Sequence, residues 1–342
     1  MKNFMNNNNK KEASKEPQKF FTRLNYKIIS GLLAGLLFFT YVLYVPNIKL
    51  QNSFDSETNF FINPATSLVH KDDLLIDFQD LRELLQSKYE NRDDYLVSLY
   101  FEYLPTGANI SVNKDEKIWP ASLIKIPVAM AALKKVQDKK WKINNELVIL
   151  DEDKDSEYGV LYKEPTGTTL TIKKVLEETL INSDNTAHFV LLRNLDGGEL
   201  EDVYTHLGLD DIIESLKQSP KADSDVDNRI TAKRYSVFFR SLYNATYLTP
   251  EYSQMFLQIL EKAPKELINQ GLPSDITFVH KTGIRIDEKV KADAGIVYVP
   301  GRPYLITVMI QQKKKGEFNQ EAIDGLFKNI SEEIYSHVTR PR

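Results

Sequence analysis

Five strand-like segments lie towards the two ends of this sequence, and a long stretch with few strand signals separates them. Two of the segments fall near residue 100 and three fall after residue 276. They are Tyr95–Tyr103, Asn109–Asn113, Thr277–Thr282, Ala292–Val299 and Tyr304–Gln311. Because strands bury their apolar faces best within a shared layer, we expect both ends of the domain to meet in one sheet.

Helical periodicity fills the intervening stretch and flanks the strands. It predicts helices over Asp73–Tyr89, Ala121–Lys140 and about Glu321–His337. Leu305–Ile310 is apolar at nearly every position, which indicates a strand that is covered on both faces. The predicted fold class is therefore α/β, of the α+β type. We expect a five-stranded, mainly antiparallel sheet flanked by helices, with an all-helical subdomain inserted between its second and third strands.

The N-terminal region carries a separate signal. Residues 26–45 (YKIISGLLAGLLFFTYVLYV) contain one charged residue, Lys27, and are long enough to cross a bilayer as a helix. Seven Lys and Arg residues against two Glu in residues 1–27 favour a cytoplasmic N-terminus. We expect a disordered cytoplasmic tail over 1–25, a single-pass membrane anchor over 26–45, a stalk over 46–71 and an extracytoplasmic globular domain over 72–342. A cleaved signal peptide and a buried core helix are the alternatives, but the apolar run is long for the first and lacks a polar face for the second.

Composition and charge exclude several classes of function. The net charge of −4 includes +5 from residues 1–27, which leaves −9 on the rest of the chain. An acidic body lacks the electrostatic footprint of a nucleic-acid-binding protein. The chain has no cysteine, so disulfides, thiolate nucleophiles and cysteine metal sites are excluded. Its five histidines show no metal-binding spacing, and no phosphate loop or dinucleotide motif is present, so we expect no metal and no cofactor.

Ser122 and Lys125 form the first of three short motifs that carry chemistry. Residues three apart at the start of a helix lie on one face, so the Lys125 amine can reach the Ser122 hydroxyl. The unpaired N–H of Ser122 can donate to an oxyanion. Apolar neighbours should desolvate Lys125 and lower its pKa toward that of a usable base. A capping serine beside a surface lysine is the alternative reading.

The second motif, Ser183-Asp184-Asn185, lies between two segments with helical periodicity. Ser183 could pass a proton to a leaving group, and Asn185 could bind a substrate amide carbonyl. Asp184 would brace the loop from behind. Taken alone, the motif is also a good helix N-cap.

The third motif, Lys281-Thr282-Gly283, closes a predicted strand. Glycine at a strand end often marks the close approach of another backbone, so a substrate could add along this edge. Lys281 and Thr282 could then hold a substrate carboxylate, and the N–H of Ile284 could be a second oxyanion donor. An ordinary strand-to-turn ending is the alternative.

Together and in this order, the three motifs resemble those of class A β-lactamases and the related penicillin-binding serine hydrolases. The resemblance runs from about Asp72 to the C-terminus and includes Thr-Gly-x5-Asn, Ser-Asp-Asn-Thr-Ala and a late Ala-Gly-Ile-Val-Tyr strand. It implies a β-lactamase/transpeptidase-like fold with Ser122 as the acylated nucleophile, Lys125 as its base and Ser183 as the proton relay. It also implies that Asn185 contacts the substrate amide and that Lys281 with Thr282 forms the carboxylate site.

The sequence departs from this family in one respect. Class A β-lactamases carry a Glu-x-x-Leu-Asn string whose glutamate activates the water that hydrolyses the acyl-enzyme, and no such string occurs here. Glu214, followed by Ser-Leu-Lys, matches it only in part and is the candidate deacylation base. Tyr158 could form a wall of the cleft or lie exposed in a loop. Arg285 could assist at the carboxylate site or lie in a solvated turn.

These observations lead us to expect a membrane-anchored serine hydrolase. Its substrates would be β-lactams or D-Ala-D-Ala-type peptide amides, attacked through an acyl-Ser122 intermediate. Two alternatives stay open. One is a D,D-peptidase-like penicillin-binding protein without efficient β-lactamase turnover, and the other is a catalytically silent binder of cell-wall peptides. The expected partners are the substrate and the membrane, with no nucleic acid.

Overall fold

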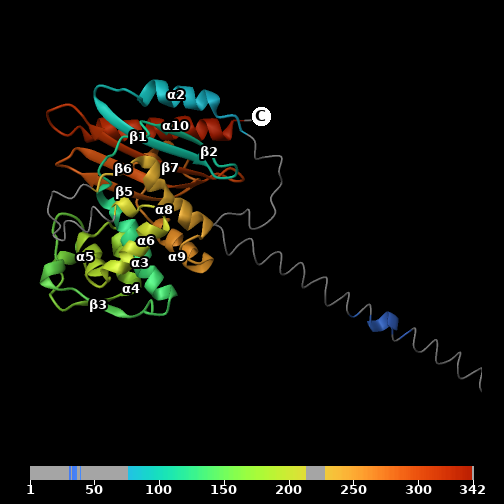
Figure 1. Cartoon of the computed structure of the whole chain (residues 1–342), viewed down its shortest axis with the longest axis vertical. Coiled ribbons are helices and arrows are strands. Elements are labelled where there is room, and N and C mark those ends of the chain that lie inside the picture. Colours follow the sequence, from blue (N-terminus) through green and yellow to red (C-terminus); the bar gives the residue numbers. More distant parts are fainter. Residues whose placement is uncertain (1–30, 32, 37–38, 40–75, 213–227, 341–342) are drawn as a thin grey trace, which may run out of the picture. The chain divides into compact units, whose positions relative to one another are not determined.

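The structure, a computed structural model, describes residues 31, 33–36, 39, 76–212 and 228–340 (Figure 1). The chain divides into two compact units, Met1–Thr58 and Asn59–Arg342. In the first unit the described residues are helical, and Leu33, Leu36 and Phe39 among them are exposed. A search of the described residues finds no helix with the length and apolar character that a bilayer span requires. The predicted tail and stalk, and most of the predicted anchor, lie outside the described residues.

The second unit is built on one five-stranded sheet with the order β2-β1-β7-β6-β5. Its strands are β1 (Tyr95–Tyr103), β2 (Ala108–Val112), β5 (Thr277–Arg285), β6 (Val290–Tyr298) and β7 (Tyr304–Gln312). All neighbouring strands are antiparallel, and β1 pairs with β7 from Tyr95 opposite Gln312 to Tyr103 opposite Tyr304. The two ends of the domain therefore meet in one sheet, as predicted. β5 lies at the edge of the sheet.

Helices cover both faces of this sheet (Figure 1). α2 (Gln79–Tyr89) and α10 (Gln320–Thr339) lie on one face, and the helical subdomain lies on the other. Alternate residues of β7 belong to different cores: Ile306 and Val308 pack in the core that contains α2 and α10 residues, whereas Leu305 and Met309 pack in the core of the helical side. The predicted burial of this strand on both faces is confirmed.

The helical subdomain occupies the stretch between β2 and β5. Its helices are the 3-10 segment η3 (Ala121–Ile124), then α3 (Lys125–Gln137), α4 (Ile172–Leu180), α5 (Asn185–Arg193), α6 (Gly197–His206), α8 (Ala232–Asn244) and α9 (Pro250–Leu260). The described residues of this stretch also form three 3-10 segments, η4 (Asp151–Asp153), η5 (Leu161–Lys163) and η6 (Leu267–Gly271). A small antiparallel sheet of β3 (Glu146–Val148) and β4 (Thr169–Thr171) also lies here. Strands of three residues are too short for a hydrophobic period to reveal them.

Three predicted boundaries differ from the observed ones. The first helix begins at Gln79, where the N–H donates to Asp77 Oδ1 at 2.9 Å, and not near residue 73. The predicted helix over Ala121–Lys140 is split into η3 and α3, because Pro127 has no N–H to bond the carbonyl of Leu123. The Tyr235 hydroxyl donates to that carbonyl at 2.9 Å. β5 continues beyond Thr282 to Arg285, since its pairing with β6 runs through Gly283.

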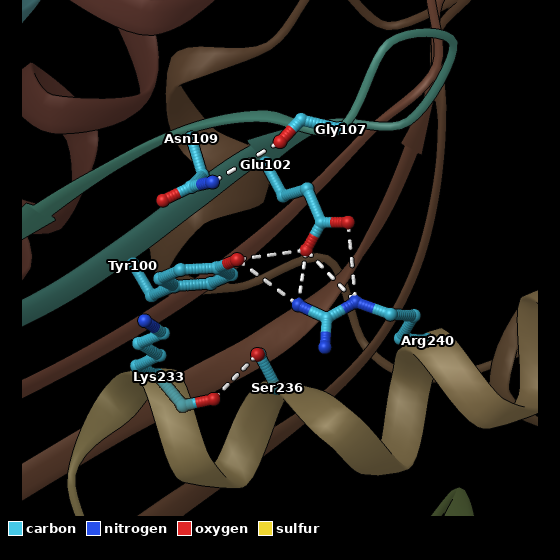
Figure 2. A network of polar contacts seen from close by, with 7 residues as sticks. All are labelled: Tyr100, Glu102, Gly107, Asn109, Lys233, Ser236 and Arg240. Carbon is cyan, nitrogen blue, oxygen red and sulfur yellow. Dashed lines mark hydrogen bonds and ion pairs between the residues drawn. The ribbon is translucent and has the colours of Figure 1, made fainter.

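A polar network joins the sheet to the helical layer (Figure 2). Arg240 of α8 donates through Nε to both carboxylate oxygens of Glu102 on β1, at 3.1 and 2.9 Å. The Tyr100 hydroxyl donates to the same carboxylate at 2.8 Å and accepts from Arg240 Nη2 at 3.0 Å. The buried carboxylate of Glu102 therefore has charged and neutral partners, which a carboxylate removed from water requires.

Candidate active site

A cleft of about 330 Å³ opens along the exposed edge of the sheet, where all three motifs contribute. The first motif supplies Ser122, the second Ser183 and the third Thr282 and Gly283. The other lining residues are Tyr158, Glu266, Leu267, Gln270, Ile284, Lys291, Gln320 and Asp324. Segments that are far apart in the sequence thus converge on one serine hydroxyl.

The Lys125 amine occupies the centre of the motif cluster. Its Nζ lies 3.3 Å from Ser122 Oγ, 3.1 Å from Ser183 Oγ and 2.7 Å from Asn185 Oδ1, and it also donates to the Ser183 carbonyl. These acceptors outnumber the three hydrogens of an ammonium. In the neutral amine, two N–H groups can still donate while the lone pair accepts the proton of Ser122.

Burial makes the neutral form of Lys125 accessible. The side chain is 1% exposed. Desolvation lowers the pKa of Lys125 to about 7, and the charge of Lys281 adds to this, whereas Asp184 and Asp155 act in the opposite direction. About half of the molecules would hold a neutral amine near pH 7, so this lysine can act as a general base.

The backbone is strained on both sides of this amine. Ala121, which precedes Ser122, has φ 49°, and Ser183 has φ 55°. Residues with a side chain rarely adopt this left-handed region, and such strain persists where the surroundings impose it. Here it directs the hydroxyls of Ser122 and Ser183 toward the same amine.

Asp184 braces the loop that carries Tyr158. Its Oδ1 accepts from the Ala187 N–H at 2.9 Å and so caps α5. Its Oδ2 accepts from the N–H groups of Val160 and Leu161, at 2.6 and 2.9 Å. Gly159, which precedes Val160, has φ 100°, and a Cβ there would lie 2.0 Å from Asp184 Oδ2, so only glycine fits.

The Asn185 side chain is held at both ends. Its Oδ1 accepts from Lys125, and its Nδ2 donates to Asp155 Oδ1 at 2.9 Å. One hydrogen of the amide NH₂ group is used by Asp155, which leaves the second for a ligand carbonyl. Asp155 was not predicted as a site residue, because an isolated Asp in a loop carries no motif.

The third motif lies on the edge strand beside Ser122. A Cβ on Gly283 would lie 2.9 Å from Ser122 N and 3.0 Å from Pro120 O, so glycine is required for the approach of the two backbones. Ile284, the next residue, lines the same cleft. Lys281 is 2% exposed, and burial lowers its pKa to about 8, against the opposing charges of Asp293 and Glu266.

The remaining sequence candidates are Glu214, Arg285 and Tyr158. Glu214 lies outside the described residues. Arg285 lies 4.1 Å from the centre of the Trp119 ring and pairs with Asp287 at 3.1 Å. Tyr158 does line the cleft, with 46% of its surface exposed. Within the described residues, no cluster of His, Asp or Glu could hold a metal ion.

Sequence reasoning missed five polar residues of the cleft. They are Glu266, Gln270, Lys291, Gln320 and Asp324. Lys291 on β6 pairs with Asp324 on α10 at 2.6 Å. Since these residues come from η6, the turn before it, β6 and α10, only the tertiary fold brings them beside Ser122.

Comparisons with known proteins agree with this geometry. Residues 79–338 match the family model described as "Beta-lactamase enzyme family". β-Lactamase ROB-1 of Haemophilus influenzae is 23% identical over 276 residues, which cover 78% of this chain and 88% of ROB-1. β-Lactamase VEB-1 of Pseudomonas aeruginosa is 24% identical over 235 residues, covering 64% and 79%.

Solved structures show the same fold at low identity. PBP-A superposes with a TM-score of 0.66 at 22% identity, covering 77% of this chain and 98% of PBP-A. A β-lactamase from Sphaerobacter thermophilus DSM 20745 gives a TM-score of 0.67 at 23% identity, with the same coverage. A variant of PBP-A has been solved as its acyl-enzyme complex with penicillin G.

Proposed function

We propose, since the chain belongs to the β-lactamase enzyme family and is a serine hydrolase that acts on amides, that Ser122 is its acylated nucleophile. The substrates we propose are β-lactams or D-Ala-D-Ala-type peptide amides. The observation that carries the proposal is the contact of 3.3 Å between Lys125 Nζ and Ser122 Oγ, made by an amine whose pKa burial lowers to about 7.

In the proposed reaction, neutral Lys125 takes the Ser122 proton while Oγ attacks the amide carbon. The N–H groups of Ser122 and Ile284 would hold the oxyanion. Ser183, in contact with the same amine, would pass the proton to the departing nitrogen, and the C–N bond then breaks to leave an ester on Ser122. Asn185 would hold the substrate amide, and Lys281 with Thr282 its carboxylate.

A penicillin-binding protein with slow turnover is the second candidate. The observation that favours it is the absence of a Glu-x-x-Leu-Asn string from the sequence. The carboxylates that line the cleft in the described part of the chain are those of Glu266 and Asp324, and Asp324 is paired with Lys291. Acylation needs neither, whereas rapid hydrolysis of the ester needs a base for water.

A fluorescent penicillin tests both candidates. We expect a covalent adduct on the wild-type protein, none on Ser122→Ala, and an unchanged adduct on the control Ser87→Ala, which removes an exposed hydroxyl of α2. Loss of the adduct with release of hydrolysed drug would identify a β-lactamase, and a persistent adduct a penicillin-binding protein. Labelling of folded Ser122→Ala would show that Ser122 is not the nucleophile. Absence of labelling in the folded wild type would favour a catalytically silent binder of cell-wall peptides.

For the location, we propose that residues 26–45 anchor the domain on the outer face of the cell membrane. The support is the apolar composition of this segment and the basic residues before it. Because the chain has no cysteine, Ser87→Cys introduces a single thiol. We expect an impermeant maleimide to label it on intact cells. Release of the protein from membranes by salt alone would contradict the anchor.

A further inference from the structure

One wall of the cleft is formed by the short segment Pro264–Ile268, and the fold holds it at both ends. His280 Nε2 lies 3.1 Å from the Pro264 carbonyl, and Asp293 Oδ2 accepts from the Ile268 N–H at 3.1 Å. His280 and Asp293 are fully buried and bond to one another at 2.8 Å. Between these anchors, Leu267 has φ 47°, a strained conformation that the anchors impose.

This held segment presents Glu266 to the cleft. The side chain is exposed and lines the cleft with Ser122 and Tyr158. Among the described residues it makes no hydrogen bond and no ion pair. The neighbouring Lys265 amine donates instead to the Ser274 carbonyl at 3.3 Å.

The charges around Glu266 leave its carboxylate without a counter-ion in the cleft. Lys291 is paired with Asp324. Glu266 acts on Lys281 at longer range than an ion pair, because its carboxylate raises the pKa of Lys281 against the effect of burial. Glu266 also raises the pKa of Tyr158. The carboxylate therefore lies within electrostatic reach of both the substrate-carboxylate site and an exposed aromatic ring.

We propose that Glu266 is a specificity-determining residue of the cleft, which favours amide substrates that carry an ammonium group besides their carboxylate. A substrate with a second carboxylate would meet a like charge fixed by the wall segment, whereas an ammonium would find Glu266 and the face of Tyr158. This inference rests on the proposed function, because it concerns the substrates that acylate Ser122.

Three penicillins that differ in side-chain charge test the inference on the full chain. Ampicillin carries an ammonium, benzylpenicillin no charge and carbenicillin a second carboxylate. The measured quantity is the second-order rate constant of Ser122 acylation for each, in the wild type, Glu266→Gln and Glu266→Lys. The control Asp275→Asn removes an exposed carboxylate that does not line the cleft.

We expect Glu266→Gln to lower the ratio of the ampicillin to the carbenicillin rate constant by about fivefold or more at low salt, and less at high salt. Glu266→Lys should lower it further, and Asp275→Asn should leave it unchanged. A ratio that stays within about twofold of the wild type in both Glu266 variants would overturn the inference while the proposed function stands. Failure of all three drugs to acylate the folded wild type would overturn both.

Discussion

At Lys125, burial and neighbouring carboxylates act on the amine in opposite directions. Burial and the charge of Lys281 lower its pKa to about 7, whereas Asp184 and Asp155 favour the ammonium. Both aspartates also have structural partners, Asp184 in the loop of Val160 and Asp155 at Asn185. The two carboxylates that shape the site through hydrogen bonds therefore also favour the protonated form of Lys125 through their charge.

The rate of Ser122 acylation should depend on pH through two lysines. It should rise as Lys125 becomes neutral, with a midpoint near the pKa of about 7, because only the neutral amine accepts a proton. It should fall above the pKa of Lys281, about 8, because the neutral amine no longer attracts a carboxylate. We expect a bell-shaped profile of the second-order acylation rate constant in stopped-flow labelling.

Lys281→Arg separates the two limbs of this profile. Arginine stays charged throughout the range, so the descending limb should disappear while the ascending limb stays. A profile that is flat between pH 5.5 and 7 in the wild type would show that Lys125 is not the titrating base.

The burial of Lys125 should also make the free energy of unfolding depend on pH. Its pKa is about 7 in the folded state and about 10.5 in the unfolded chain, so between these values the unfolded state binds more protons. The free energy of unfolding therefore rises with pH in this window through this group. From pH 7 to 9, the wild type should gain about 2 kcal/mol relative to Lys125→Met. Urea titrations at both pH values measure the difference, and an equal change in the two proteins would contradict the lowered pKa.

At the scale of elements, strand β5 makes contacts that matter for the cleft on both faces of the sheet. Gly283 faces Ser122, whereas His280 bonds to Asp293 and to the Pro264 carbonyl on the opposite side. Both ring nitrogens of His280 thus have oxygen partners, and these contacts tie β5 to β6 and to the wall of the cleft. Gly295 permits this arrangement, because a Cβ there would lie 2.7 Å from His280 Cβ.

Removing the carboxylate of Asp293 should loosen the cleft wall. Asp293→Leu leaves His280 Nδ1 and the Ile268 N–H without partners, and each unsatisfied buried polar group costs about 1–3 kcal/mol. Asp293→Asn keeps an acceptor for Ile268 and should cost less. We expect weaker binding of the fluorescent penicillin in both variants, with a smaller change in the limiting acylation rate. If the two variants lose stability but bind and react with the fluorescent penicillin as the wild type does, the His280–Asp293 pair has a structural role only.

Prediction from the sequence succeeds where information is local. The hydroxyl of Ser122 and the amine of Lys125 lie one turn apart, so their spacing predicts their contact, and strand patterns at both ends of the domain predict a shared sheet. Glu266 and Asp324 carry no local signal, since only packing of the turn before η6 and of α10 against β5 and β6 brings them to the cleft. The sequence pattern does not predict the split of the helix before Pro127. Helical periodicity follows the spacing of apolar residues, whereas the split arises from a missing backbone N–H donor.

At the scale of the whole molecule, every described residue of the cleft belongs to the unit Asn59–Arg342. The pairing of β1 with β7 joins the two ends of this unit in one sheet, and α2 and α10 cover one face of it, so the described part of its core is formed by residues of this unit. We therefore expect a fragment of residues 72–342 to fold alone.

The fragment should match the full chain in detergent in two measurements. Its midpoint of urea unfolding should be the same, and its rate of labelling by fluorescent penicillin should agree within about twofold, because compact units with their own core fold independently. Ser122→Ala in the fragment is the control for labelling. A fragment that folds but labels slowly would show that residues 1–71 contribute to the cleft, and one that fails to fold would show that the sheet needs them.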